Sequence, residues 1–175
     1  MFSEIELKIS ARLEKGGWRR DVAGADYDTA VRGLSKALST ERLGVIVSGE
    51  SGVGKTSMFS AILTMATKIN CVLQESVQIY DREAYPDIVD LAMDGNVFID
   101  DLGAENIVNV YGVRKDIVGD FICRFHLLGK GRLFVTTNLR GEEIMNRYGG
   151  RVFSRLKDLC VPIRFVGKDK RAWTL

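Results

Sequence analysis

The chain has 175 residues, 46% of them hydrophobic and 27% charged, which fits one globular domain with a sizeable core and perhaps a short extension. No apolar run approaches the roughly 18 residues of a membrane span, and the N-terminus lacks a basic-then-apolar export signal, so neither a membrane nor a secreted protein is expected. Residues 147–171 hold eight basic and two acidic residues, a net charge of +6, whereas the rest of the chain holds 17 basic and 21 acidic residues, a net charge of −4. The basic C-terminal segment could therefore bind nucleic acid or form a solvated face.

Three isolated cysteines indicate a reducing compartment. Cys71, Cys123 and Cys160 are odd in number and lack the spacing of metal ligands. All three fall in apolar surroundings, so we expect buried free thiols in a cytoplasmic protein.

Residues 1–27 are expected to form a helix and an irregular connector ahead of a core domain at residues 28–175. The apolar residues before Gly16 fit one face of a helix, although they also alternate as a strand would. Asp28 could cap the first helix of the core. Trp18 could cover a bound adenine, but packing is the preferred interpretation.

The segment Gly49–Thr56, Gly-Glu-Ser-Gly-Val-Gly-Lys-Thr, has the sequence of a phosphate-binding P-loop. It follows an expected buried strand at residues 43–48 and precedes an expected helix at residues 55–68. Its glycines let successive N–H groups point at phosphates, and the helix adds its positive end. Lys55 would reach the β- and γ-phosphates, and the Thr56 hydroxyl would bind magnesium. The expected nucleotide-binding residues are Gly49, Glu50, Ser51, Gly52, Val53, Gly54, Lys55, Thr56 and Ser57.

Strands and helices alternate through the rest of the chain. This alternation predicts a three-layer α/β fold whose parallel sheet binds ligands at the carboxyl ends of its strands. The further expected strands lie within residues 71–80 and at 96–99, 132–136 and 161–166. The further expected helices lie at residues 86–93, 113–128, 142–148 and 152–159.

Polar side chains follow two of these strands. A buried strand ends at Asp100 and Asp101, and paired carboxylates are costly there without a cation. They are interpreted as a Walker B element, with Asp100 holding magnesium and Asp101 orienting or deprotonating water; an acidic surface loop is the alternative. Asn138 could contact the γ-phosphate or the water, or it could simply form a turn. Glu105 is expected at the surface or behind the site.

Three arginines could stabilise charge on a transferring phosphoryl group, within one chain or from a neighbour. Arg151 and Arg155 are four residues apart and share one helix face. Arg171 follows the last strand. A surface or DNA-backbone role is the alternative for each.

Together these motifs resemble the AAA+ ATPases of the DnaC/IstB group, which includes bacterial and phage helicase loaders and transposition helper ATPases. The resemblance covers roughly residues 20–171. It is carried by residues 49–56, 98–105 (Phe-Ile-Asp-Asp-Leu-Gly-Ala-Glu), 136–139 (Thr-Thr-Asn-Leu) and 150–152 (Gly-Arg-Val) with Arg155 following.

The resemblance implies an AAA+ core with a five-stranded parallel sheet in the order 5-1-4-3-2 and a reduced C-terminal lid. It implies ATP and Mg²⁺ bound at Lys55, Thr56 and Asp100, with Asp101 as catalytic acid/base and Asn138 as sensor 1. It further implies that Arg155 is the arginine finger acting on a neighbouring subunit's ATP, with Arg151 as the alternative finger, and that Arg171 is sensor 2.

The resemblance also implies a function, namely ATP-dependent assembly of a homo-oligomer that engages single-stranded DNA and delivers a replicative helicase. A transposition helper with a transposase partner is the second interpretation, and a P-loop phosphotransferase or a nucleotide-regulated binding protein is less favoured. Fewer than 45 residues precede the first core strand, so the chain could be a minimal member or the ATPase portion of a longer protein. Asp101 stands where Glu is common, which suits a weak, assembly-stimulated ATPase.

Overall fold

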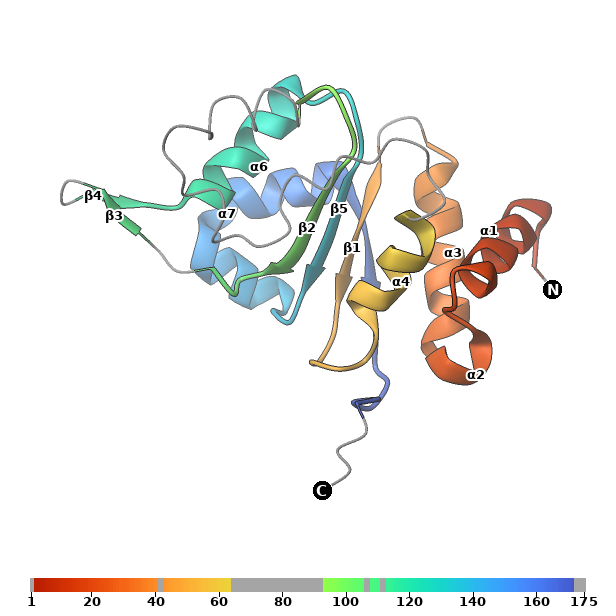
Figure 1. Ribbon diagram of the computed structural model, residues 1–175. Coiled ribbons are helices and arrows are strands. Elements are labelled where there is room, and N and C mark those ends of the chain that lie inside the picture. Colours follow the sequence, from red (N-terminus) through yellow and green to blue (C-terminus); the bar gives the residue numbers. More distant parts are fainter. Residues whose placement is uncertain (1, 41–42, 64–92, 106–107, 111–112, 172–175) are drawn as a thin grey trace.

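The computed structural model describes residues 2–40, 43–63, 93–105, 108–110 and 113–171 (Figure 1). A parallel sheet of four strands lies at its centre in the order β2-β5-β1-β6. The strands are β1 (Gly44–Ser48), β2 (Val97–Leu102), β5 (Leu133–Thr137) and β6 (Cys160–Arg164). The described sheet therefore has four strands, whereas five were expected. These four correspond to the first, third, fourth and fifth expected strands, and they lie in the expected order 5-1-4-3. The expected second strand lies outside the described residues, as does the helix expected at residues 86–93 except its last residue.

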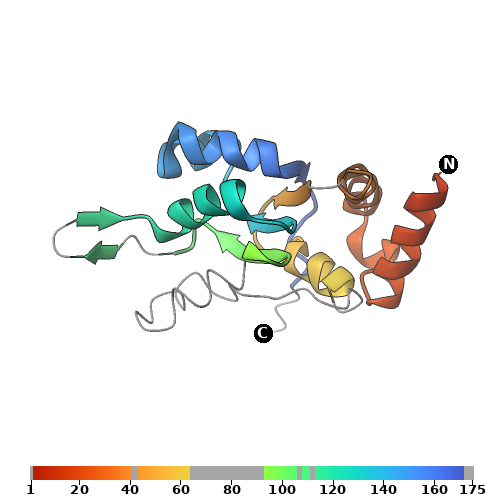
Figure 2. The same cartoon turned by 90° about the horizontal axis from the view of Figure 1, so that it is seen from above.

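Helices cover both faces of this sheet, as the alternation predicts (Figures 1 and 2). One hydrophobic cluster joins three helices to side chains that all four strands point to one face, and a second joins two helices to the side chains that the strands point to the other face. The helices of the first face are α1 (Glu4–Lys15), α3 (Asp26–Leu38) and α4 (Lys55–Leu63), and those of the second are α6 (Ile117–Leu128) and α7 (Gly141–Leu159). Among the described residues, no helix combines the length and apolar character needed to cross a bilayer.

The N-terminal segment is a helix, not a strand, and its capping explains why. The Ser3 hydroxyl accepts from Glu6 N at 3.3 Å, while the Glu6 carboxylate accepts from Ser3 N at 2.7 Å. This reciprocal capping box satisfies two N–H groups that a helix start otherwise leaves free. Ile9 and Leu13, four residues apart, are buried on one face.

The expected irregular connector is partly helical. It contains α2 (Arg20–Ala23), and α3 begins at Asp26, two residues before the expected cap. The Asp26 carboxylate is buried and accepts from Val166 N at 2.8 Å and Gly167 N at 2.9 Å. This tertiary contact, which no local pattern reveals, fixes the start of α3. The domain division between residues 27 and 28 stays a prediction.

The helix expected at residues 113–128 begins later, at Ile117. Asp116 caps it by accepting from Gly119 N at 2.9 Å. The preceding residues form β4 (Val113–Lys115), which pairs antiparallel with β3 (Val108–Val110) in a hairpin that projects from the body (Figure 2). The two helices expected in residues 142–159 are present as the two parts of α7, which meet at a kink where Gly149 is non-helical (φ 83°).

Candidate functional site

The candidate site lies where β1, β2 and β5 end. The segment Gly49–Thr56 joins β1 to α4, which begins at Lys55 as expected. The backbone reverses at Gly52 (φ 79°) and Gly54 (φ 97°), in a region that side chains with a Cβ rarely adopt. Val53 packs into the core, whereas Glu50, Ser51 and Ser57 are exposed.

Lys55 lies beneath this loop with 5% of its surface exposed. Its ammonium donates to the carbonyls of Gly49 and Glu50, each at 2.8 Å, and to Asn138 Oδ1 at 2.6 Å. Burial lowers the pKa of Lys55, although the carboxylates of Asp101 and Asp100 oppose the shift. A buried ammonium held by neutral acceptors could exchange them for phosphate oxygens, which carry charge.

Asp100 and Thr56 meet at the end of β2. Thr56 Oγ1 donates to Asp100 Oδ1 at 2.9 Å, and Thr136 Oγ1 donates to the same carboxylate oxygen at 2.5 Å. Oxygen donors alone are the set that magnesium prefers, so Thr56 and Asp100 fit this ion. Thr136 is fully buried and orients the carboxylate. Its position as the last residue of an expected strand gave no sign of this role.

Asp101 is exposed and has φ 53°, the only positive φ of a non-glycine among the described residues. Its N–H donates to Thr136 Oγ1 at 2.8 Å, and its carbonyl accepts from Ala104 N at 2.9 Å. Such backbone geometry costs about 1–3 kcal/mol and persists only when neighbours enforce it. The turn therefore presents the second carboxylate at the edge of the site, where it could orient water.

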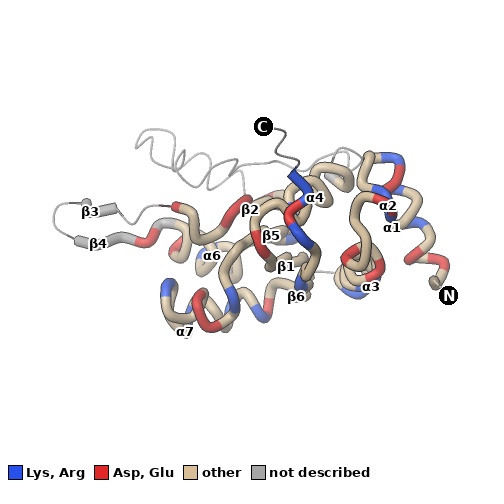
Figure 3. The backbone as a smooth tube through the Cα atoms, turned by 90° about the horizontal axis from the view of Figure 1, so that it is seen from below, with Lys and Arg blue, Asp and Glu red and all other residues tan. Residues whose placement is uncertain are grey.

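The segment after β6 lies against the phosphate loop. Lys170 N donates to the Gly52 carbonyl at 3.0 Å, and the Arg171 guanidinium donates to Ser51 Oγ. Asp169 lies so close that a Cβ added at Gly52 would be 1.7 Å from its Oδ1. Figure 3 shows the basic residues of this segment beside the start of α4. Arg171 is therefore brought to the loop, as a sensor would need to be.

Arg151 and Arg155 lie on α7, and within the described residues no hydrogen bond or ion pair joins them to the phosphate loop. Arg151 is exposed. Arg155 is partly buried, and its Nη1 has no hydrogen-bond partner among the described residues. Their roles stay predictions.

Glu105, expected at the surface or behind the site, is 7% exposed. Its carboxylate accepts from Gly103 N at 2.9 Å and from the hydroxyl of Tyr148, and it pairs with Arg147. Sequence reasoning missed this cluster because Arg147 and Tyr148 belong to a distant helix.

No group of three or more His, Cys, Asp or Glu side chains in the described part of the chain could hold a metal. Cys123 and Cys160 are free, but only Cys160 is buried; Cys71 lies outside the described residues. Burial raises the pKa of the Cys160 thiol, which suits an inert position.

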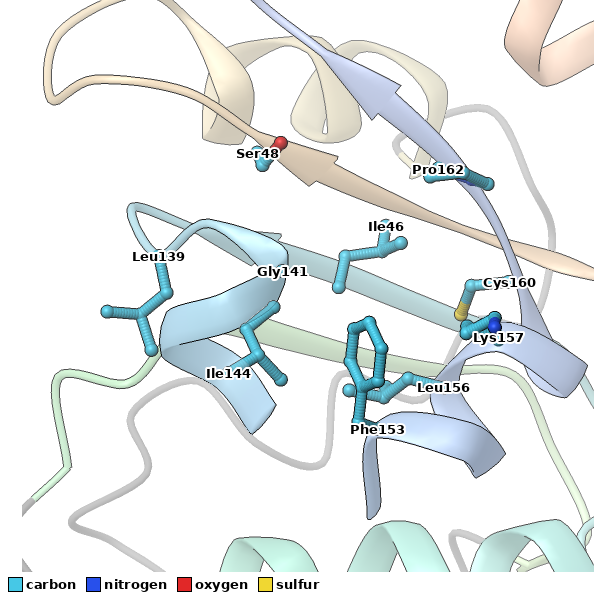
Figure 4. Close-up of a pocket in the computed structure, with 10 residues that line it drawn as sticks. All are labelled: Ile46, Ser48, Leu139, Gly141, Ile144, Phe153, Leu156, Lys157, Cys160 and Pro162. Atoms are coloured by element: carbon cyan, nitrogen blue, oxygen red, sulfur yellow. The ribbon is translucent and has the colours of Figure 1, made fainter. Parts of the chain in front are cut away.

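Two hollows flank the sheet, and their chemistry differs. A polar one of about 270 Å³ adjoins the phosphate loop and includes Asn138, Arg140 and Lys168. The other, of about 400 Å³, lies between α7 and the sheet and is lined mainly by apolar side chains such as Ile46 and Phe153 (Figure 4). The first hollow, which adjoins the phosphate loop and is lined by several polar and basic groups, suits a polyphosphate better than the second, whose basic lining residue is Lys157.

The fold resembles a known structure, although no protein-family model and no curated protein matches the chain significantly. A solved structure described as "Crystal Structure of the DnaI" superimposes with a TM-score of 0.63 over 87% of this chain and 93% of that chain, at 19% sequence identity. At this identity the similarity establishes the α/β fold and no finer relationship.

Proposed function

We propose that this chain is a magnesium-dependent P-loop ATPase of the AAA+ kind. The observation that carries the proposal is the convergence of Lys55, Thr56, Asp100 and Asn138 from three strand ends into hydrogen-bond contact. A single glycine-rich turn could match a motif by chance. Four side chains of the required chemistry at one sheet edge are much harder to obtain by chance.

Each residue has a role in this proposal. The loop N–H groups and Lys55 hold the phosphates, while Thr56 and Asp100 hold Mg²⁺, which supplies charge neutralisation. Asp101 orients the attacking water and accepts its proton. Asn138 contacts the γ-phosphate or the water while staying neutral. The shorter Asp at position 101 suits slow, switch-like hydrolysis.

The site is completed by a second copy of the chain in this proposal. Hydrolysis commonly needs an arginine on the transferring group, and Arg155, or else Arg151, would reach a neighbour's ATP from α7. Arg171 would sense nucleotide within its own chain, from its contact with Ser51.

The biological role proposed is loading or remodelling of a replicative helicase, with contacts to single-stranded DNA. Support comes from the motif resemblance to the DnaC/IstB group and from the fold shared with DnaI. A transposition helper ATPase would have the same core, so the two roles differ in the protein that the chain binds, a replicative helicase or a transposase. A pull-down of the full-length gene product against a replicative helicase and a transposase tests this, and binding to neither would remove both roles.

Phosphate release, measured across concentrations at which the protein self-associates, tests the assembly. We expect a rate per chain that rises with concentration, and a loss of at least tenfold in Arg155→Ala. Arg12→Ala, an exposed change on α1, is the control and should leave the rate unchanged. A rate that Arg155→Ala leaves intact would remove the finger assignment.

A further inference from the structure

A buried carboxylate lies behind the turn that carries Asp101. The turn is tight: Ala104 N donates to the Asp101 carbonyl at 2.9 Å, and Gly103 has φ 105°. Glu105 closes it by accepting from Gly103 N at 2.9 Å. Because Glu105 is only 7% exposed, its charge needs partners from elsewhere in the fold.

Helix α7 supplies these partners. The Tyr148 hydroxyl donates to Glu105 Oε1, and the Arg147 guanidinium donates to the Glu105 carbonyl and lies 3.4 Å from Oε1. Burial and the Glu105 charge raise the pKa of Tyr148, so its hydroxyl remains a donor at neutral pH. Both ends of the Glu105 residue, carboxylate and carbonyl, are thereby tied to one helix.

The turn begins at Asp101, the residue proposed to orient the attacking water. Asp101 holds its unusual backbone geometry only because neighbours enforce it, and Thr136 restrains just its N–H. We propose that Glu105, held by Tyr148 and Arg147, is a positioning residue that fixes the Asp101 carboxylate for attack by water. This inference rests on the proposed ATPase function and adds a residue to it.

The test compares two buried tyrosine hydroxyls that each bond a glutamate. Tyr148→Phe and Glu105→Gln should lower the single-turnover rate of ATP hydrolysis about tenfold, a partial loss of what a well-placed base contributes. The Kd for MgATP, measured by calorimetry, should stay within about twofold. The double variant should be no slower than the slower single variant, because both changes break one network.

Tyr27→Phe is the matched control. The Tyr27 hydroxyl is also buried and donates to Glu14 Oε1 at 3.0 Å, but this hydrogen bond joins α3 to α1. This variant should lose comparable thermal stability and keep the wild-type rate.

The two proposals fail in different ways. A wild-type protein that binds no MgATP overturns the proposed function itself. If the wild type hydrolyses ATP and Tyr148→Phe matches it, or if Tyr27→Phe is slowed equally, the positioning role is wrong and the ATPase stands. Binding without any hydrolysis overturns the positioning role too, because Asp101 then has no reaction to serve.

Discussion

Lys55 Nζ lies 2.6 Å from Asn138 Oδ1, although 83 positions separate the two residues in sequence. The contact follows from topology: Lys55 begins the helix after β1, Asn138 follows β5, and the two strands are parallel neighbours. It joins the residue proposed to hold phosphate with the residue proposed to sense it.

Asn138→Ala should slow hydrolysis more than it weakens binding. Loss of one oriented polar group beside the reacting phosphate is expected to cost about tenfold to a hundredfold in rate. Lys55 keeps two carbonyl partners, so the Kd for MgATP should change less than about threefold. Phosphate-release kinetics with calorimetry measure both, and Asn146→Ala on the exposed face of α7 is the control. A change confined to the Kd would contradict a sensor role.

Gly52→Ala should destabilise the protein by about 1–2 kcal/mol and weaken nucleotide binding. Gly52 has φ 79°, and an added Cβ would meet the Asp169 carboxylate. Urea unfolding measures the loss. Gly150→Ala is the control, because an added Cβ there meets nothing within 4 Å, and its stability should stay equal or rise. Equal effects at the two glycines would show that the geometry of the loop is not the cause.

Asp169→Asn should tighten the binding of MgATP about threefold to fivefold. Its carboxylate lies against Gly52, so it repels a polyphosphate held by the loop, while its ion pair with Arg171 partly offsets the charge. Calorimetry at two salt concentrations should show the gain shrinking as salt rises. Asp94→Asn, a surface change at an ion pair with Lys130, should have no effect. Weaker binding by Asp169→Asn would mean that the carboxylate serves to place Arg171.

Lys55→Met should change how stability depends on pH. Because burial lowers the pKa of Lys55 below its ordinary value of 10.5, the unfolded chain holds this proton more tightly than the folded one. The free energy of unfolding of the wild type therefore rises with pH between the pKa values of Lys55 in the folded and unfolded chain. The free energy of unfolding of the variant lacks this increase, because Met does not titrate. Urea unfolding at pH 7.5 and 10.5 should show the wild type gaining relative to Lys55→Met. A constant difference would contradict the pKa shift.

The phosphate loop was predictable from sequence because its requirements are local. Glycines at positive φ, a preceding apolar strand and a following helix all lie within 20 residues, and the structure has each of them. Alternation of strands and helices likewise predicted the layers. The arrangement of Asp100 and Asn138 at one edge followed from the rule that parallel strands end together.

The residues that sequence reasoning missed act through distant contacts. Asp26 sets the start of α3 by binding the backbone at residues 166 and 167, and Glu105 depends on Tyr148. Val113 fits the apolar face of a helix, yet it pairs in a hairpin because Asp116 caps the helix three residues later. In each case a tertiary partner or a cap overrode the local pattern.

The most direct test of nucleotide binding is calorimetric titration of the purified protein with ATP in the presence of Mg²⁺, beside Lys55→Ala. We expect saturable binding by the wild type, a Kd raised at least tenfold in the variant, and weaker binding by both when Mg²⁺ is removed. Absence of binding by the wild type, or equal binding by Lys55→Ala, would contradict the central claim that Gly49–Thr56 holds a nucleotide.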